Sequence, residues 1–447
     1  MASLIRKLIP QSVVNNLDHL PNAIAAVTRY GFPARRMTVV GVTGTDGKTT
    51  TTSLIHHLLR TAQVRTGMIT TVEAILNDTH YDTGFHTTTP ITWKMQQLLH
   101  QAKLSSVTHM VIESTSIGLD QHRLYGIPFQ IGVLTNITHD HLDYHQTYEK
   151  YLLSKAKLFN HVKFAILNQD DQSYDAMRKY LDNHNPVATL ITYAIDDESA
   201  NLRATNIVLK PDGLSFIAKV NHPNFATKEL KFKIESNLIG EFNVYNLLAT
   251  IATGFALGFQ YQEIIKSLLD FHQVAGRQEL ITVQDRQIII DFAHTPNALD
   301  VLLKSLRQIY PNRRLFVMFG ATGERDKSKR QLMGELACTL ADVVVFTSDD
   351  TYFEPINHIH RQLLAGAAST SSVQISPDEK LPPNRSVYLT IPDRQSAINW
   401  IAQASKSGDV IAMLGKGHEK SINLEGIEYP WSEKESALLA FNNLDSN

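Results

Sequence analysis

Cysteine is almost absent from the chain: Cys338 is the only one among 447 residues. A lone cysteine cannot form an internal disulfide, and such scarcity is typical of proteins from a reducing compartment. Cys338 lies in the apolar stretch LMGELACTLA, which favours a buried thiol over a catalytic nucleophile. The sequence therefore predicts a cytoplasmic location.

Long apolar runs are also absent. No stretch approaches the roughly 18 residues of a membrane span, and the N-terminus lacks the continuous apolar core of a secretion signal. The first residues contain SLIRKLIPQSVVNNL, which is mildly amphipathic. This pattern favours a helix that packs on the protein, with contact to a membrane surface as the alternative.

Neither sign of charge dominates, because the formal net charge is -2. The basic footprint expected of a nucleic-acid-binding protein is therefore missing. The content of 43% hydrophobic and 19% charged residues is typical of a globular protein, and the length allows two or three domains. We expect a monomer whose partners are small molecules and peptides, not nucleic acid.

Strands and helices alternate in the first half of the chain. Apolar runs predict strands, and Lys48–Thr61 has the spacing of an amphipathic helix, as has Trp93–Ala102. This alternation predicts a doubly wound α/β domain that binds ligands at the carboxyl ends of its strands. The predicted strands are Met37–Val42, Val64–Ile69, His109–Glu113, Ile131–Asn136 and Phe164–Asn168.

The pattern changes after residue 200. Short alternating segments at 200–235 predict antiparallel hairpins, Asn243–Leu257 and Tyr261–Leu269 predict helices, and 365–384 predicts a loop. A second α/β run follows a boundary near 270–276. Its predicted strands are Gln287–Asp291, Arg314–Phe319, Val343–Thr347, Ser386–Thr390 and Val410–Leu414.

The stretch GVTGTDGKTTTT, residues 41–52, follows a strand and opens a helix. This context suits a phosphate-binding loop, because glycines let the backbone approach the phosphates and the helix N-terminus attracts them. Lys48 would add a point charge, and Thr49 a ligand for Mg²⁺. The strict GxxxxGK[ST] pattern is not met because residue 42 is valine, so a glycine-rich turn at a helix start is the alternative.

This loop and nine further motifs resemble the Mur ligase family, the ATP-dependent amide-forming ligases of peptidoglycan assembly. The forms HDHLDYH and GKGHE are most similar to the tripeptide synthetases of that family, which add the third residue of the peptide. The motifs are TGTDGKTT (43–50), ESTSIGLDQHR (113–123), TNITHDHLDYH (135–145), YLLSKAKLF (151–159), GEFNVYN (240–246), GRQEL (276–280), DFAHTPNAL (291–299), GATGERDKSKR (320–330), TSDD (347–350) and GKGHE (415–419).

The resemblance implies a central P-loop ATPase domain and a C-terminal Rossmann-like ligase domain. We therefore predict a short helical N-terminal segment over 1–36, the ATP-binding domain over 37–272 and the amino-acid-binding domain over 273–447. In the resembled enzymes a separate N-terminal domain holds the UDP part of the acceptor. About forty residues precede the loop and are too few for such a domain, so a reduced or relocated UDP site is expected.

The metal ligands include one unusual residue type. Glu113 ends an apolar strand, and a carboxylate there suits Mg²⁺. His141 lies among three histidines and two aspartates, a set that chemistry alone would assign to zinc as readily as to magnesium. The resemblance assigns His141 to the second of two Mg²⁺ ions, and leaves Asp140 and Asp143 as hydrogen-bonding organisers.

Lys155 has an unusual predicted role. In the family the lysine at this place is carbamylated by CO₂, which makes it a carboxylate that supports the second Mg²⁺. The alternative for Lys155 and for its neighbour Lys157 is a solvated helix face. We predict Lys48, Glu113, His141 and Lys155 as the catalytic residues, and Thr49, Glu113, His141 and Lys155 as the residues that hold metal.

The resemblance also implies the ATP and acceptor sites. ATP binding is predicted for Gly44, Thr45, Asp46, Gly47, Lys48, Thr49, Thr50, Asn243, Asn246, Arg277, Asp291 and His294. Asn243 could instead cap its helix. The acceptor is predicted to contact Thr87, Thr88, Thr89, Thr115, Ser116, Gln121 and Arg123. The family form E-V-S-S-H is not met, because Ile117 stands where the histidine is expected.

The amino-acid site departs from the pattern of the diaminopimelate-adding enzymes. Their D-N-P-R motif aligns with Asp349-Asp350-Thr351-Tyr352, so the arginine is absent and an acid replaces the asparagine. Asp350, Glu354 and Glu419 would favour a cationic side chain, which indicates lysine or ornithine rather than meso-diaminopimelate. The predicted residues of this site are Arg325, Asp349, Asp350, Gly415 and Glu419, of which Arg325 would hold the substrate carboxylate.

The expected reaction phosphorylates a peptide carboxylate on a UDP-N-acetylmuramoyl-dipeptide-like acceptor. An amine then attacks the acyl phosphate, after the two domains close and exclude water. One alternative is a related ligase of the folylpolyglutamate or cyanophycin type. Another is a P-loop kinase or switch, which would not need the RDK and GKGHE motifs of a second domain.

Overall fold

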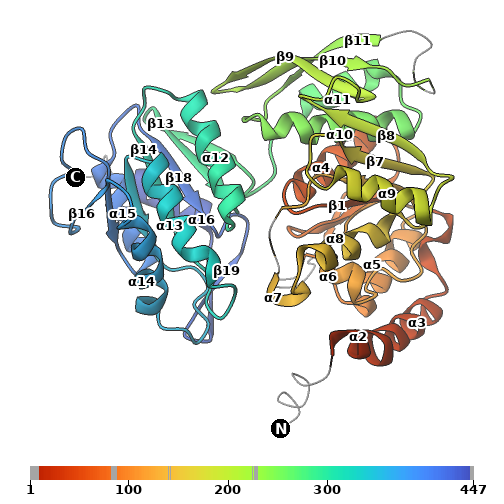
Figure 1. Cartoon of the computed structure of the whole chain (residues 1–447), viewed down its shortest axis with the longest axis horizontal. Helices are drawn as coiled ribbons and strands as arrows, with labels where there is room; N and C mark the ends of the chain where they lie inside the picture. The colour runs from red at the N-terminus through yellow and green to blue at the C-terminus, as the bar shows by residue number, and fades with distance from the viewer. Residues whose placement is uncertain are drawn as a thin grey trace. The chain divides into compact units, whose positions relative to one another are not determined.

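The computed structural model describes residues 10–81, 88–138, 140, 142–223, 225 and 230–442, without the side chains of Leu142 and Asp143. The chain divides into two compact units (Figure 1). The first comprises Met1–Val208 and Gly213–His272, and the second Leu209–Asp212 and Gln273–Asn447. Among the described residues, none of the helices is both long and apolar enough to cross a membrane.

The first unit is built on an 11-stranded sheet in the order β11-β10-β9-β8-β7-β6-β1-β5-β2-β3-β4. Its centre is parallel, whereas β3 and β4 pair antiparallel at one edge and β10 and β11 at the other. The strands are β1 (Thr38–Thr43), β2 (Thr66–Ile69), β3 (Ala74–Leu76), β4 (Thr79–Tyr81), β5 (His109–Glu113), β6 (Phe129–Leu134), β7 (Phe164–Asn168), β8 (Thr189–Ala194), β9 (Leu202–Lys210), β10 (Gly213–Val220) and β11 (Leu230–Ser236).

Helices cover both faces of this sheet. On one face α4 contacts β1, β2 and β5, while α10 contacts β7 and β8. On the other face α5, α8 and α9 form an apolar core with the same central strands. The helices are α2 (Gln11–Val14), η1 (Asn15–His19), α3 (Leu20–Arg29), η2 (Pro33–Arg36), α4 (Lys48–Thr61), α5 (Thr92–Leu104), α6 (Ser116–Asp120), α7 (Leu142–His145), α8 (Tyr148–Ala156), η3 (Lys157–Phe159), α9 (Tyr174–His184), α10 (Phe242–Ala256) and α11 (Tyr261–Asp270).

The position of β1 decides where ligands can bind. It lies between β5 and β6, so β2 to β5 lie on one side of β1, whereas β6 and the strands after it lie on the other. The crevice at such a switch point, at the carboxyl ends of the strands, is the usual ligand site of this architecture. Here that edge carries the loop after Thr43, together with Glu113 at the end of β5.

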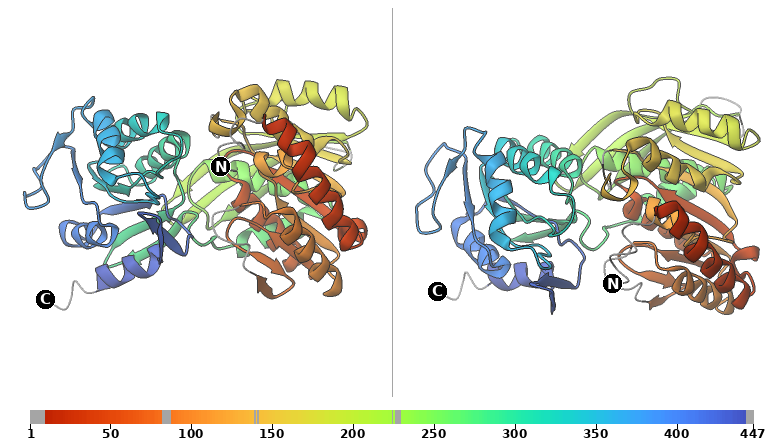
Figure 2. Two further views of the ribbon diagram at one scale, coloured as in Figure 1. Left: turned by 90° about the horizontal axis from the view of Figure 1, so that it is seen from below. Right: turned by 60° about the horizontal axis from the view of Figure 1, so that its bottom comes forward.

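The N-terminal helices extend along the outside of the first unit. Helices α2, η1 and α3 form one continuous rod, and α3 packs on α5 (Figure 2). Asn15 is buried and donates from Nδ2 to Asp120 Oδ2 at 2.7 Å, so this segment is attached to α6. The described part of the N-terminal segment is therefore helical and packs on the protein, as the sequence predicts.

The second unit contains a seven-stranded sheet in the order β12-β13-β18-β14-β15-β17-β16 and a separate hairpin, β19-β20. Only β12 pairs antiparallel within the larger sheet. The strands are β12 (Glu279–Val283), β13 (Arg286–Asp291), β14 (Leu315–Phe319), β15 (Val343–Phe346), β16 (Val373–Gln374), β17 (Val387–Thr390), β18 (Val410–Leu414), β19 (Ser421–Leu424) and β20 (Ile427–Pro430).

Five helices cover this second sheet, α15 and α16 on one face and α12, α13 and α14 on the other (Figure 1). A Cβ atom at Gly334 of α13 would lie 2.1 Å from the Leu363 carbonyl oxygen of α14, so the glycine permits this close approach. The helices are α12 (Pro296–Ile309), α13 (Ser328–Leu340), α14 (Ile356–Ala367), α15 (Arg394–Ala404) and α16 (Glu433–Asn442).

Several elements have the bounds that the sequence predicts. Helix α4 and strands β5, β7 and β18 agree residue for residue. The other predicted strands of the two sheets differ by one or two residues at one end, or at both ends for β1 and β6. The expectation of a loop over 365–384 is wrong in part, because α14 continues to Ala367 and β16 lies within the segment.

A buried ion pair joins α15 to α16 beneath the ends of β15 and β18. Arg394 and Glu433 are 1% and 0% exposed, and Arg394 Nη2 lies 2.7 Å from Glu433 Oε1. Arg394 also donates to the carbonyl oxygens of Ser348 and Leu414, at 2.8 Å each. The pair therefore fixes the start of two loops that follow these strands.

We predict that Arg394→Met lowers the free energy of unfolding of the second unit by about 3–5 kcal/mol, because Glu433 would be a buried carboxylate without its cation. Urea denaturation followed by tryptophan fluorescence in a Trp93→Phe background would measure it, since Trp400 and Trp431 then report on this unit.

Lys304→Met is the matched control, because Lys304 pairs with Asp300 on an exposed helix face. A loss below about 0.5 kcal/mol is expected there. Equal losses in the two variants would contradict the role assigned to Arg394.

Candidate active site

The loop between β1 and α4 is held by the residues that follow β6. Thr45 N donates to the Asn136 carbonyl oxygen at 2.8 Å, and Asp46 N donates to Asn136 Oδ1 at 2.9 Å. Thr135 Oγ1 donates to the Asp46 carbonyl oxygen at 2.6 Å. Lys48 folds back, with its Nζ 2.7 Å from the Thr45 carbonyl oxygen. The loop is therefore a rigid arch at the N-terminus of α4, a position that attracts phosphate.

Gly47 needs to be a glycine for two reasons. Its φ is +80°, and an added Cβ would lie 2.4 Å from Asn246 Oδ1. Asn246 Oδ1 also accepts from Thr51 Oγ1 at 3.1 Å, and its Nδ2 donates to Asn243 Oδ1 at 2.8 Å. The two asparagines thus support the loop from α10. The alternative that Asn243 caps this helix is wrong, because Glu241 holds the cap position.

Glu113 lies beside the loop with its carboxylate buried. Thr49 Oγ1 donates to Glu113 Oε2 at 3.0 Å, and Thr71 donates to the carboxylate from its backbone N and from Oγ1. A hydroxyl and a carboxylate oxygen this close together are the hard oxygen donors that Mg²⁺ prefers. The predicted pair of Thr49 and Glu113 therefore fits a magnesium site.

Lys155 points from α8 toward the phosphate loop. Its side chain is buried, and Nζ lies 2.5 Å from the Gly44 carbonyl oxygen and 4.4 Å from the centre of the Tyr151 ring. Burial, followed by the charge of Lys48, lowers the pKa of Lys155 well below its ordinary value. The amine is thereby driven toward its neutral, nucleophilic form. The alternative of a solvated lysine is wrong for Lys155 but describes Lys157, which is half-exposed and pairs with Asp120.

Four of the predicted acceptor residues form one connected group, which we call the Thr89 group: Thr89, Thr115, Gln121 and Arg123. Thr89 Oγ1 donates to the Glu113 carbonyl oxygen at 3.1 Å and accepts from Thr115 N at 3.0 Å, while Arg123 Nη1 donates to the Thr89 carbonyl oxygen at 2.7 Å. Gln121 Oε1 accepts two further bonds from the same guanidinium. The group is therefore preorganised next to the end of β5.

Ser116 is joined to the helix that carries Lys155. Its Oγ lies 3.0 Å from His145 Nε2, and His145 Nδ1 lies 3.4 Å from Ser154 Oγ. All three side chains are buried. The acceptor loop and helix α8 thus share one polar connection.

Two of the predicted residues, Thr87 and His141, lie outside the described residues. Thr50 lies in the first turn of α4, and Thr88 directly precedes the Thr89 group. The remaining predicted residues of the first unit lie at or beside the carboxyl edge of its sheet.

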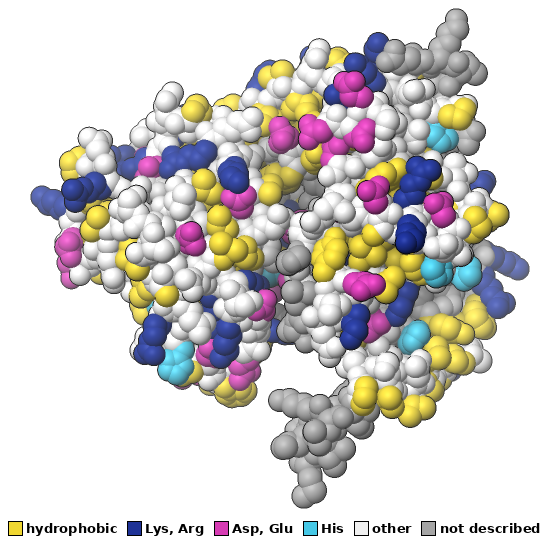
Figure 3. All heavy atoms as spheres, in the orientation of Figure 1, with side chains coloured by type: hydrophobic (Ala, Val, Ile, Leu, Met, Phe, Trp, Pro, Cys, Tyr) yellow, Lys and Arg dark blue, Asp and Glu magenta, His cyan; other side chains and the backbone are white. Residues whose placement is uncertain are grey.

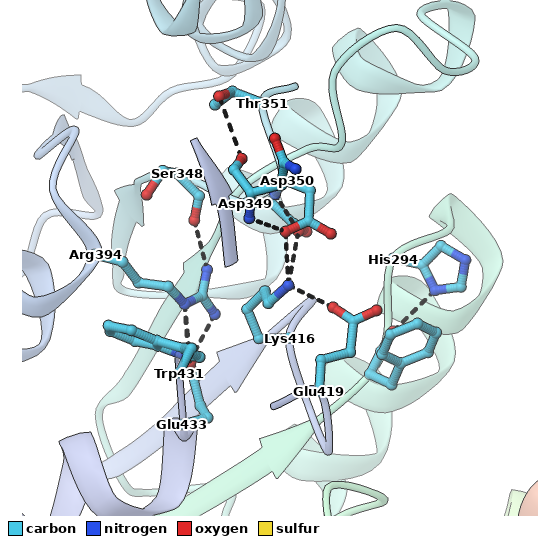
Figure 4. Close-up of polar contacts among 12 residues, drawn as sticks. His294, Ser348, Asp349, Asp350, Thr351, Arg394, Lys416, Glu419, Trp431 and Glu433 are labelled. Atoms are coloured by element: carbon cyan, nitrogen blue, oxygen red, sulfur yellow. Dashed lines mark hydrogen bonds and ion pairs between the residues drawn. The ribbon is translucent and has the colours of Figure 1, made fainter. Parts of the chain in front are cut away.

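In the second unit, three predicted acids surround a lysine. Asp349, Asp350 and Glu419 follow β15 and β18, and each offers an oxygen within 4.8 Å of the others. Lys416 Nζ lies 2.8 Å from Asp350 Oδ1, 2.5 Å from Glu419 Oε2 and 4.0 Å from Asp349 Oδ1 (Figure 4). We call these four residues the Lys416 cluster. Gly415 opens the same loop at a φ of +100°.

The acids of this cluster differ in their pKa. Burial opposes ionisation of Asp349, but Lys416 and Arg394 outweigh it and lower the pKa of Asp349. Burial, together with the neighbouring Asp349, raises the pKa of Asp350. Of these two acids, Asp349 therefore has the stronger tendency to be ionised.

The residues predicted to close over ADP gather around Phe292. The Arg277 guanidinium lies 4.6 Å from the centre of that ring, and the His294 ring 4.7 Å from it. The Asp291 carboxylate accepts from the backbone N of Gln278 and of Ala293. Asp291 therefore shapes the loops that carry Arg277 and His294.

Arg325 is exposed in the loop after β14, as a residue that must grip a substrate carboxylate requires. The loop is anchored by Glu354, which accepts from Glu324 N at 2.9 Å, forms two 2.9 Å bonds with Arg330 and also pairs with Lys327. The expectation that Glu354 attracts a cationic substrate is therefore wrong, because cations of the protein already neutralise it.

Several residues of the site were missed from the sequence, most clearly Lys416 and Arg394. The position of Lys416 two residues after the fully buried strand β18 was the available signal. The sequence near Arg394 gave no such signal, because its partner Glu433 lies on another helix, 39 residues away.

Two family models match the chain: the Mur ligase middle domain over residues 42–254 and the Mur ligase, glutamate ligase domain over 276–417. A UDP-N-acetylmuramoyl-L-alanyl-D-glutamate–2,6-diaminopimelate ligase from Geobacillus thermodenitrificans is 37% identical over 407 residues, which cover 89% of this chain and 77% of that one. UDP-N-acetylmuramyl-tripeptide synthetase 2 from Oceanobacillus iheyensis is 36% identical, with 89% and 76% covered.

Solved structures of the same family also resemble this chain. A UDP-N-acetylmuramoyl-L-alanyl-D-glutamate–2,6-diaminopimelate ligase superposes with a TM-score of 0.63 and 30% identity, over 92% of this chain and 80% of that one. The MurF ligase of Thermotoga maritima in complex with ADP gives a TM-score of 0.64 at 18% identity, over 95% and 83%, and so shows the shared fold alone. The chain belongs to the Mur ligase family, whose members are ATP-dependent ligases.

Proposed function

We propose that the chain adds a diamino acid, L-lysine or ornithine, to a UDP-N-acetylmuramoyl-dipeptide acceptor at the expense of ATP. The observation that carries the proposal is the buried amine of Lys155, which lies against the phosphate loop at the sheet edge that also holds Thr49 and Glu113. The names of the relatives indicate the acceptor, since they describe ligases acting on UDP-N-acetylmuramoyl-L-alanyl-D-glutamate.

The proposed reaction has two steps. A carboxylate oxygen of the acceptor attacks the γ-phosphorus of ATP, the bond to the β-phosphate oxygen breaks, and ADP leaves. The amine then attacks the acyl carbon, the carbon–oxygen bond to phosphate breaks, and the amine loses a proton. In the first step the positive charge of Lys48 and the N-terminus of α4 stabilise charge on the transferring group.

The carboxylate and the γ-phosphate repel each other, which is the main obstacle to the first step. Mg²⁺, when bound, would reduce this repulsion and polarise the phosphoryl group. Thr49 and Glu113 would hold one ion, and His141 and Lys155 are the proposed ligands of a second.

A neutral Lys155 can acquire the charge that a metal ligand needs. Its Nζ would attack the carbon of CO₂ and lose one proton, which gives an N-carboxylate in place of an ammonium. The lowered pKa of Lys155 favours this step, because only the neutral amine is nucleophilic.

The acceptor would lie against the Thr89 group and Ser116. Arg123 bonds to Thr89 and Gln121, so its role is to shape this surface, and the buried Ser116 supports the surface through His145. On the face shown in Figure 3, acidic and basic side chains are interspersed, which agrees with small-molecule partners rather than nucleic acid.

The choice of amino acid rests on the Lys416 cluster. Its three acids, Asp349, Asp350 and Glu419, favour the distal ammonium of lysine or ornithine over a second carboxylate. Tyr352 stands where the family arginine would hold a distal carboxylate. Several relatives are named as 2,6-diaminopimelate ligases, which makes diaminopimelate the competing substrate.

Release of ADP, measured over a panel of acceptors and amino acids, tests the proposal. It should require both a muramoyl-dipeptide acceptor and an amine, and be fastest with lysine or ornithine. Preference for diaminopimelate would overturn the proposed specificity. Activity on folyl or aspartyl acceptors would indicate a ligase of the folylpolyglutamate or cyanophycin type. Phosphoryl transfer that does not require an amine would indicate a kinase.

We predict that Lys155→Ala lowers kcat at least about 100-fold while the Kd for ATP changes less than about threefold, because the loop that binds phosphate is retained. Added acetate should restore part of the turnover by supplying the missing carboxylate. Lys157→Ala is the matched control on the same helix and should retain activity. Normal turnover in Lys155→Ala would refute the assignment.

We predict that Tyr352→Arg raises kcat/KM for meso-diaminopimelate about tenfold, because a guanidinium can pair with the distal carboxylate. The backbone φ of Tyr352 is +47°, and both side chains bear the same strain there. Tyr352→Lys should gain less, since an ammonium lacks the planar fork. An unchanged ratio of lysine to diaminopimelate use in Tyr352→Arg would contradict the prediction.

A further inference from the structure

The start of the N-terminal rod carries a buried amide. Over Gln11–His19, Asn15 alone is buried, with 5% of its surface exposed. An amide withdrawn from water is costly unless it is hydrogen-bonded. Gln11 Nε2 donates to Asn15 Oδ1 at 2.9 Å, and Asn15 Nδ2 donates to Asp120 Oδ2 at 2.7 Å. An ionised carboxylate only accepts hydrogen bonds, so Asp120 fixes the orientation of the amide.

The turn that Asn15 opens is irregular. Asn15–His19 form a π-helical turn, in which Leu20 N donates to the Asn15 carbonyl oxygen, five residues back. Such turns are rare and occur frequently at functional sites. The buried amide and the irregular turn therefore coincide at one residue of the rod, which directs attention to what Asn15 contacts.

Asp120 receives bonds from three elements. Its Oδ2 accepts from Asn15 on the rod and, at 3.0 Å, from the Tyr144 hydroxyl of α7. Its Oδ1 pairs with Lys157 Nζ of η3 at 2.7 Å. Burial opposes ionisation of Asp120, but Lys157, followed by the bonds from Tyr144 and Asn15, outweighs it and lowers the pKa of Asp120. Asp120 is therefore an anion that ties the rod to α7 and η3.

Asp120 is also the last residue of α6, the helix that begins in the predicted acceptor site. Ser116 is the first residue of α6, and Gln121, a member of the Thr89 group, directly follows Asp120. Burial and the charge of Asp120 raise the pKa of Tyr144 to about 12, and a hydrogen bond with Gln121 opposes the rise. A movement of Asp120 would thus reach Gln121 along the backbone and through Tyr144.

We propose that Asn15 is a positioning residue of the acceptor site: through Asp120 it holds the end of α6, and with it Gln121, in the place that acceptor binding requires. This inference rests on the proposed function. Without the amide, Asp120 keeps Tyr144 and the half-exposed Lys157. The carboxylate would then turn toward water, and the end of α6 would lose its fixed position.

The test is Asn15→Leu in the full chain, which keeps the size of the side chain and removes its hydrogen-bond donor. The KM for the UDP-N-acetylmuramoyl-dipeptide acceptor should rise at least about tenfold, because a bond to a charged group is lost, while the KM for ATP stays within about twofold. An unchanged KM for the acceptor, or an equal rise in both KM values, would overturn the proposal.

Two matched controls should leave both KM values within about twofold of those of the unaltered chain. Asn16→Leu makes the same change at the next residue of the turn, which is exposed. Lys157→Ala removes a partner of the same carboxylate from its more exposed side. A rise in the KM for the acceptor in Asn16→Leu as large as in Asn15→Leu would also overturn the proposal.

An exchange of the two side chains tests the bond itself. Asn15→Asp places a second carboxylate where the amide lies 2.7 Å from Asp120, so the KM for the acceptor should rise further than in Asn15→Leu. Adding Asp120→Asn to Asn15→Asp restores an amide next to a carboxylate, and should bring this KM within about threefold of its original value. A double variant with no recovery would contradict the proposal, whether or not Asn15→Leu folds.

Amine-dependent ADP release by the unaltered chain tests the proposed function separately. Its absence would refute that function, and this inference with it. Its presence, together with an unchanged KM for the acceptor in Asn15→Leu, would refute this inference alone.

Discussion

The contact between Lys155 Nζ and the Gly44 carbonyl oxygen joins helix α8 to the loop after β1. A charged lysine at this depth, near Lys48, would be costly, so the amine tends toward its neutral form. The contact exists because β1 lies between β5 and β6, which brings the loop after β1 and the helix after β6 to the same sheet edge. The proposed location of the chemistry thus follows from the strand order.

Buried ion pairs hold the second unit's loops in a comparable way. Arg394 with Glu433, and Arg330 with Glu354, lie beneath the loops that follow β14, β15 and β18. Each arginine also donates to a loop carbonyl oxygen, to Ser348 and Leu414 in one case and to Thr322 in the other. These pairs limit the movement of the loops that carry Arg325 and the Lys416 cluster.

Local sequence was sufficient for most of the central strands and for α4, but not for the segment 365–384. The ends of α4 could be predicted to the residue because a glycine precedes the helix and an apolar stripe runs along it. The ends of β5 and β18 could be predicted because their apolar runs are short and end abruptly. Partners distant in sequence could not be predicted. Glu354 was expected to attract substrate because nothing in the chain near it indicates Arg330, 24 residues away.

In the proposed reaction, the chain activates an acceptor carboxylate by phosphorylation. An acceptor labelled with ¹⁸O in both oxygens of that carboxylate tests it directly, by mass spectrometry of the phosphate released with ATP and amine present. An acyl phosphate passes one carboxylate oxygen to phosphate, so one ¹⁸O per phosphate is predicted. Phosphate without ¹⁸O, formed together with the amide product, would contradict the account.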